Sequence, residues 1–108
     1  KTYHALIDWS KYSKNLFQAS FNGQAIGRNV ASLLSSKLCH SNDKRIHVIG
    51  ISVGAFAADS CMKRLKEEDK NVFVQLTLLD PFLQRGVFDF RLDGKRNFGV
   101  GAGGLLLI

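Results

Sequence analysis

The pentapeptide Gly50-Ile51-Ser52-Val53-Gly54 constrains the fold more than any other feature of this sequence. An apolar run over residues 45–50 predicts a buried strand before it, and apolar residues at helical spacing predict a helix near 53–68 after it. A serine at such a sharp strand-to-helix turn has unfavourable backbone angles, so Gly50 and Gly54 remove side chains that would clash. The turn lifts the Ser52 hydroxyl above the sheet edge and directs the Val53 N–H toward the same point, where it could stabilise an oxyanion.

Two further strands and one further helix are predicted around this turn. Residues 3–8 and 72–79 are strand-like, and residues 22–39 carry apolar side chains at helical spacing, with Ser20 or Asn22 as the helix cap. The polar and aromatic stretch between Trp9 and Ser20 predicts a loop. The near-continuous apolar run at 72–79 is typical of a strand covered on both faces. Alternating strands and helices predict two right-handed crossovers and a parallel sheet.

The length and composition of the chain predict a single domain of limited size. The chain has 108 residues, of which 45% are hydrophobic and 22% charged, with one proline. This composition excludes a disordered or low-complexity chain, and the length excludes two domains. Beyond Asp80-Pro81 glycines interrupt every pattern and no element is predicted. We therefore expect one α/β domain over residues 1–108, three-layered with a parallel sheet, in which residues 83–108 are a divergent glycine-rich tail.

The charge distribution favours a solvated surface over a nucleic-acid interface. Fifteen Lys and Arg against nine Asp and Glu give a net charge of +6. The basic residues are spread along the chain and mixed with acids, whereas a nucleic-acid binder concentrates them on one face with aromatic residues. We expect no nucleic-acid partner. Weak attraction to acidic membranes or glycans stays open.

The cysteines and apolar runs exclude other classes. Cys39 and Cys61 are too few for a disulfide framework or a zinc site, and both fall in helical patterns, so we expect small buried side chains. We predict no metal and no cofactor. No apolar run approaches the roughly 20 residues that span a bilayer. Residues 1–10 lack the apolar core and cleavage site of a signal peptide, so the compartment stays open.

A carboxylate follows the third predicted strand, in Leu78-Leu79-Asp80-Pro81. The carboxyl ends of parallel strands meet at the edge where open α/β sheets bind ligands. Asp80 is therefore expected on the same rim as Ser52, one strand away. A turn cap before proline is the structural alternative.

Four sequence pieces carry a resemblance to a known family. These are a strand end at residues 7–9, a helix entry at residues 18–22, the serine turn with the strand before it at residues 46–54, and the strand end at residues 78–81. They resemble the V-D-W, Q-A-S-x-N, H-I-I-G-H-S-L-G and L-D-P motifs of the pancreatic-type triacylglycerol lipase family, which has the α/β-hydrolase fold. Order and spacing agree over roughly residues 5–82.

The resemblance implies roles for three residues and a class of substrate. Ser52 matches the nucleophile, Asp80 the triad acid and the Val53 N–H an oxyanion-hole donor. Lipids or small esters would be the substrates, peripheral contact with lipid surfaces would follow, and the protein would be secreted. Two neighbours depart from the family pattern, since Ile51 replaces a frequent His and Val53 replaces Leu.

Two family elements have no counterpart in this sequence. The His-Gly loop that supplies a second oxyanion donor would precede residue 3, and the catalytic His would follow Asp80, but no His follows His47. His4 and His40 are predicted at the amino edge of the sheet and His47 inside a strand, packed within the sheet. The leading hypothesis is an ester hydrolase acting through Ser52 that is impaired in this chain. The alternative is a non-catalytic lipid- or protein-binding remnant. A dinucleotide-binding enzyme fails because no G-x-G-x-x-G opens a helix.

Overall fold

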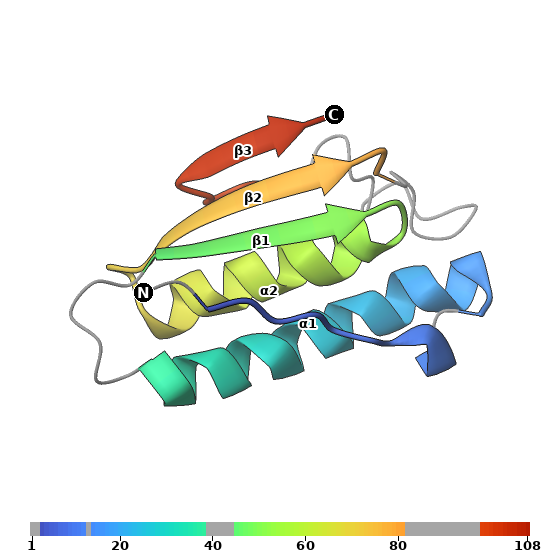
Figure 1. The fold of residues 1–108 in the computed structure, drawn as a ribbon, viewed down its shortest axis with the longest axis horizontal. Helices are drawn as coiled ribbons and strands as arrows, with labels where there is room; N and C mark the ends of the chain where they lie inside the picture. The colour runs from blue at the N-terminus through green and yellow to red at the C-terminus, as the bar shows by residue number, and fades with distance from the viewer. Residues whose placement is uncertain (1–2, 13, 39–44, 82–97) are drawn as a thin grey trace.

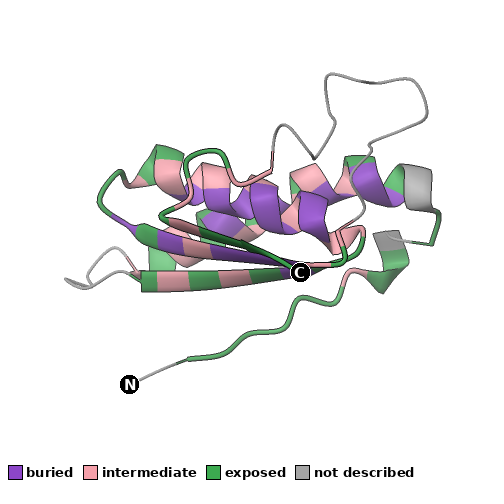
Figure 2. Cartoon of the chain, turned by 90° about the horizontal axis from the view of Figure 1, so that it is seen from above, coloured by how far each residue is buried: buried purple, intermediate pink, exposed green. Residues whose placement is uncertain are grey.

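The computed structural model describes residues 3–12, 14–38, 45–81 and 98–108. These residues form an α/β fold with a parallel three-stranded sheet (Figure 1), which supplies the sheet and one helical layer of the expected three-layer arrangement. Both helices lie on one face of the sheet (Figure 2). In chain order the elements are a short 3-10 helix η1 (Ser10–Tyr12), α1 (Leu16–Leu38), β1 (Arg45–Ile51), α2 (Gly54–Glu68), β2 (Phe73–Leu79) and β3 (Gly104–Leu107). The predicted unit of strand, helix and strand around Ser52 is confirmed within one or two residues at each boundary.

The hydrophobic core lies between the sheet and α2. Alternate residues of β2, Val74, Leu76 and Leu78, are fully buried and face the helices. From α2, Met62 and Leu65 complete this core, and α1 packs along α2. Every second residue of β2 is apolar and faces α2, and the apolar residues of α2 recur at helical spacing on the side that faces β2. The two apolar faces therefore pack against each other.

The other face of the sheet is not covered by any described element. Successive β1 residues alternate between partly buried and exposed, and Ile49 and Ile51 on the open face are 56% and 64% exposed. Phe73 of β2 and Leu106 of β3 are also exposed. The predicted covering of residues 72–79 on both faces is therefore not found among the described residues, where helices cover one face only.

The chain before β1 differs from its prediction. Residues 3–9 form no strand and are exposed, except for the half-buried Trp9. A strand needs a hydrogen-bonded neighbour as well as an apolar sequence, and no described strand pairs with this segment. The helix begins at Leu16 rather than near residue 22, so Ser20 and Asn22 lie inside α1 and do not cap it. Ala19 and Ser20 are fully buried, so packing extends the helix through the stretch predicted as a loop.

The last residues form a strand that was not predicted. β3 pairs in parallel with β2, with Leu105 opposite Leu76. The turn before β3 is held to α2, because the Gly99 N–H donates to Asp59 Oδ1 at 2.8 Å and the Phe98 ring meets Phe56 edge-on at 5.0 Å. The glycines before this four-residue strand, and Gly104 at its first position, hide its pattern. Residues 83–97 of the predicted tail lie outside the described residues.

Candidate active site

Ser52 lies at the turn between β1 and α2 with a backbone conformation that is rare for a side-chain-bearing residue. Its φ is 53°, in the left-handed region. The Ser52 N–H donates to Leu79 O at 2.9 Å, which continues the β1–β2 ladder, and Ser52 O accepts the Ala55 N–H at 3.1 Å, which begins the turn into α2. The side chain is exposed at the sheet edge. The predicted sharp turn with a raised serine is present.

The two glycines of the pentapeptide differ in what surrounds them. A Cβ on Gly50 would lie 2.7 Å from Ala58 Cβ and 2.8 Å from Gly54 O, so only glycine lets β1 approach α2 this closely. A Cβ on Gly54 would meet no described atom within 4 Å. The expectation that both glycines prevent a clash therefore holds for Gly50 and is wrong for Gly54.

Asp80 lies beside Ser52 at the carboxyl edge of the sheet. Ile51 pairs with Leu79 in the parallel register, so Ser52 and Asp80 are the next residues on two neighbouring strands, about 4.8 Å apart by strand spacing. Asp80 also has a positive φ, 45°, and its N–H donates to Ile108 O at 2.7 Å. No hydrogen bond joins the Ser52 and Asp80 side chains, and both residues are exposed.

The backbone after Ser52 offers hydrogen-bond donors to the same edge. Val53 is the N-cap of α2, and no side chain caps this end of the helix. The Val53 N–H makes no hydrogen bond within the described part of the chain. Free N–H groups and the helix dipole at such an end favour negative charge. The place suits an oxyanion.

None of the described histidines reaches Ser52. His47 is exposed on the open face of the sheet, where its Nε2 lies 2.8 Å from Thr77 Oγ1, so the interpretation that it packs within the sheet is wrong. Strand alternation groups His47 with Ile49 and Ile51 on one face of β1, but it does not say which face of the strand the helices cover. His4 is exposed in the segment before η1, and His40 lies outside the described residues.

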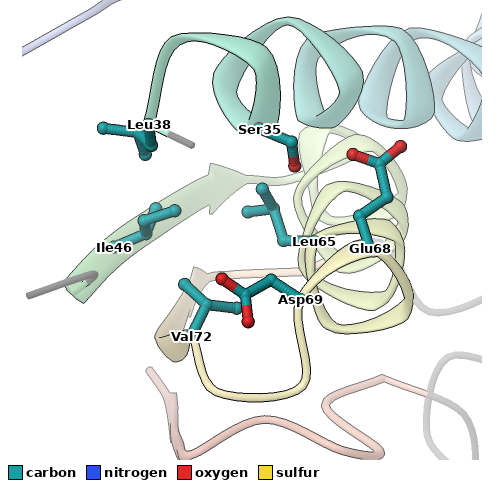
Figure 3. Close-up of a pocket in the computed structure, with 7 residues that line it drawn as sticks. All are labelled: Ser35, Leu38, Ile46, Leu65, Glu68, Asp69 and Val72. Atoms are coloured by element: carbon teal, nitrogen blue, oxygen red, sulfur yellow. The ribbon is translucent and has the colours of Figure 1, made fainter. Parts of the chain in front are cut away.

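A pocket of about 310 Å³ lies at the opposite, amino edge of the sheet, far from Ser52 (Figure 3). Its apolar wall comes from Leu65 and three other side chains, and Glu68 and Asp69 stand beside it; the full lining is Ser35, Leu38, Ile46, Leu65, Glu68, Asp69 and Val72. Hydrogen bonds, foremost from Ser35, lower the pKa of Glu68. Neither Ser52 nor Asp80 lines this pocket.

Other reactive or ligating groups do not form a second centre in the described part of the chain. Cys61 is buried in α2, as predicted, and burial raises the pKa of its thiol to about 11, so it stays protonated near neutral pH. Cys39 lies outside the described residues. Among the residues that the structure describes, no three His, Cys, Asp or Glu gather as a metal site, and neither helix is long and apolar enough to cross a membrane.

Comparisons with protein-family models, curated proteins and solved structures found no match to this chain. The functional argument therefore depends on the geometry of Ser52, Val53 and Asp80 at one edge of the sheet.

Proposed function

We propose that this chain carries the nucleophile-bearing part of a serine ester hydrolase of the lipase type. The observation that carries the proposal is the exposed Ser52, held at φ 53° between a parallel strand and a helix. A serine in this position presents its Oγ clear of the sheet, and the adjacent helix end supplies oxyanion donors. The substrate class is an acyl ester, and the resemblance to lipases favours lipids or small esters.

The roles of the three groups follow from acyl-transfer chemistry. Ser52 Oγ attacks the ester carbonyl, the ester C–O bond breaks, and the alcohol leaves with the proton that the base took from the serine hydroxyl. Water then hydrolyses the acyl-enzyme to the acid and restores the Ser52 hydroxyl. The Val53 N–H donates to the oxyanion that forms on attack. Asp80, one strand away, would orient a histidine between the two side chains and stabilise its protonated form.

The sequence also supports reduced activity in this chain. A serine hydroxyl is a weak nucleophile near neutral pH without a positioned base, and no His follows Asp80. The second oxyanion donor, which the family places in its His-Gly loop, is not among these 108 residues, and a site without one such donor is slower by roughly 10²–10³-fold. We therefore expect the 108-residue chain to be a poor esterase by itself.

The test supplies the base from solution. The purified chain is incubated with an alkyl fluorophosphonate and with a short-chain ester, with and without added imidazole, beside Ser52→Ala and the remote serine variant Ser36→Ala. We expect phosphonylation at Ser52, confirmed by mass spectrometry, and imidazole-dependent turnover that Ser52→Ala loses and Ser36→Ala keeps. Labelling and turnover that survive Ser52→Ala would refute the proposal. Robust turnover without imidazole that Ser52→Ala abolishes would overturn the expected lack of a base.

The exposed apolar side chains of Ile49 and Ile51 on the open face of the sheet favour a second candidate, a non-catalytic remnant that binds lipid or protein. This candidate predicts no reaction of Ser52 with the phosphonate at any imidazole concentration. Binding to vesicles of neutral lipid that is unchanged in Ser52→Ala would then favour it.

A further inference from the structure

The outer edge of β1 is long, regular and unpaired in the described part of the chain. The sheet order is β1-β2-β3, so β1 is an edge strand of seven residues. The Ser52 N–H points to β2, and backbone groups alternate in direction along a strand. The N–H and C=O groups of His47, Ile49 and Ile51 therefore point outward from the sheet.

This edge has few of the features that keep edge strands apart. Charged side chains, proline, bulges or short length normally prevent edge pairing, whereas β1 has no Pro, pairs with β2 in unbroken register, and carries Arg45 only at its first position. The exposed Ile49 and Ile51 lie along it. β3, the other edge, has only four residues and begins at a glycine. The β1 edge is the better acceptor for an added strand.

A matching strand is present in the same sequence. Residues 3–7 have no regular secondary structure, and Tyr3 and Leu6 are 82% and 94% exposed. Side chains of this kind favour strands, and the segment carries no charge between His4 and Ile7 that would oppose pairing along the β1 edge.

Contacts at the end of this segment fix the chain to α1, and no described strand pairs with the segment itself. The Trp9 ring lies against α1 at Gly23, where a Cβ would be 3.4 Å from Trp9 Cη2. Asp8 Oδ1 accepts the Ser10 N–H at 3.0 Å and so turns the chain into η1. Figure 1 shows the segment, in dark blue, passing in front of α1 without joining the sheet, and Figure 2 shows it apart from both helices.

We propose that two copies of this chain associate by donating their Tyr3–Ile7 segments to each other, each segment adding a fourth strand to the β1 edge of the other copy. Each copy would donate one strand and accept one, because the chain has both an unpaired strand-like segment and an unpaired strand edge. Such an exchange gives a dimer with two-fold symmetry. The added strand would also cover part of the apolar row formed by Ile49 and Ile51.

The first experiment measures mass in solution by light scattering over a range of protein concentrations. We expect the mass to rise toward that of a dimer. Leu6→Asp, in the donor, and Ile49→Pro, which removes one outward N–H that the monomer does not use, should both give monomers. Leu33→Asp, at an exposed leucine of α1, is the matched control and should keep the dimer. A chain that is monomeric at every concentration, or a dimer that survives Leu6→Asp, would overturn the proposal.

The second experiment identifies the paired segments. Chains carrying Leu6→Cys are mixed with chains carrying Ile49→Cys, both in a Cys39→Ser background, and are oxidised. We expect a disulfide-linked heterodimer and slow amide exchange at Ile49 and Ile51, which Leu6→Asp makes fast. A third chain carries both Leu6→Cys and Ile49→Cys. If a disulfide forms within this chain and none forms between the two single variants, the segment pairs with its own β1, which contradicts the exchange.

Discussion

The two faces of the sheet have similar sequences but different surroundings. On the face toward α2, Val74, Leu76 and Leu78 are fully buried, whereas on the opposite face Ile49, Ile51 and Phe73 remain about half exposed. Since parallel sheets are normally covered on both faces, apolar residues appear on both sides of each strand. Apolar character alone therefore does not show which side chains stabilise the fold. The side chains that stabilise it are those that pack against α2.

The largest expected effect tests this difference directly. Leu76→Ala removes a fully buried side chain from the core beneath α2 and should lower the free energy of unfolding by about 2–5 kcal/mol. Ile49→Ala on the open face should change it by no more than about 0.5 kcal/mol. Urea denaturation followed by circular dichroism measures both. The measurement is made at concentrations that give the monomer, because the exchanged dimer would cover part of this face. A large loss in Ile49→Ala under these conditions would show that the open face is covered within a single chain.

The two glycines around Ser52 give the next effect. Gly50→Ala places a methyl group against Ala58 and Gly54 O and should cost about 1–3 kcal/mol of stability through overpacking. Gly54→Ala, in open space at the first residue of α2, should be neutral or slightly stabilising. Thermal unfolding of the two variants measures the contrast. Equal destabilisation would mean that the turn is tighter at Gly54 than the structure shows.

The sequence predicted some parts of the fold well and missed others. The unit from β1 to β2 was predictable for two reasons. Gly50 marks the end of the apolar run that forms β1, and the apolar residues of α2 recur at helical spacing. The segment at residues 3–8 has an equally apolar sequence but no strand partner, and pairing is a property of the whole sheet. β3 was missed because glycines precede it and its first residue is itself Gly104, which leaves only the short apolar run at residues 105–108 as a signal.

The candidate site was predictable in the same uneven way. Ser52 and Asp80 could be placed at one edge because each ends a strand of a parallel pair, and the register confirms that they are neighbours. The face on which His47 lies could not be settled, because the sequence does not say which side of β1 the helices cover. The positive φ of Asp80 also had no sequence signal, since it arises where β2 ends against Ile108.

A smaller effect concerns Asp59, which joins the turn before β3 to the covered side of the sheet. Its Oδ1 accepts the Gly99 N–H and its Oδ2 pairs with Lys63 at 2.7 Å. Asp59→Ala leaves the Gly99 N–H without its acceptor and should cost about 1–3 kcal/mol. Asp59→Asn keeps an amide oxygen for Gly99 and loses only a partly exposed ion pair, worth at most about 1 kcal/mol. Amide exchange of β3 residues, faster in Asp59→Ala than in Asp59→Asn, is the measurement.

The smallest effect is a pH dependence that arises on the covered side only. Burial in α2 raises the pKa of the Cys61 thiol from 9.0 to about 11, so the unfolded chain releases this proton at lower pH than the folded chain does. The stability linked to Cys61 is therefore fully present below pH 9 and is lost as pH rises toward 11, with a loss below about 1 kcal/mol at pH 9.5. Cys61→Ala should remove this part of the slope from urea denaturation curves measured between pH 8 and pH 10, while Ile51→Cys, on the open face, should leave it in place. An unchanged slope in Cys61→Ala, or rapid alkylation of Cys61 in the folded chain at pH 8, would mean that α2 does not shield the thiol, and the contrast between the two faces of the sheet would fail at this residue.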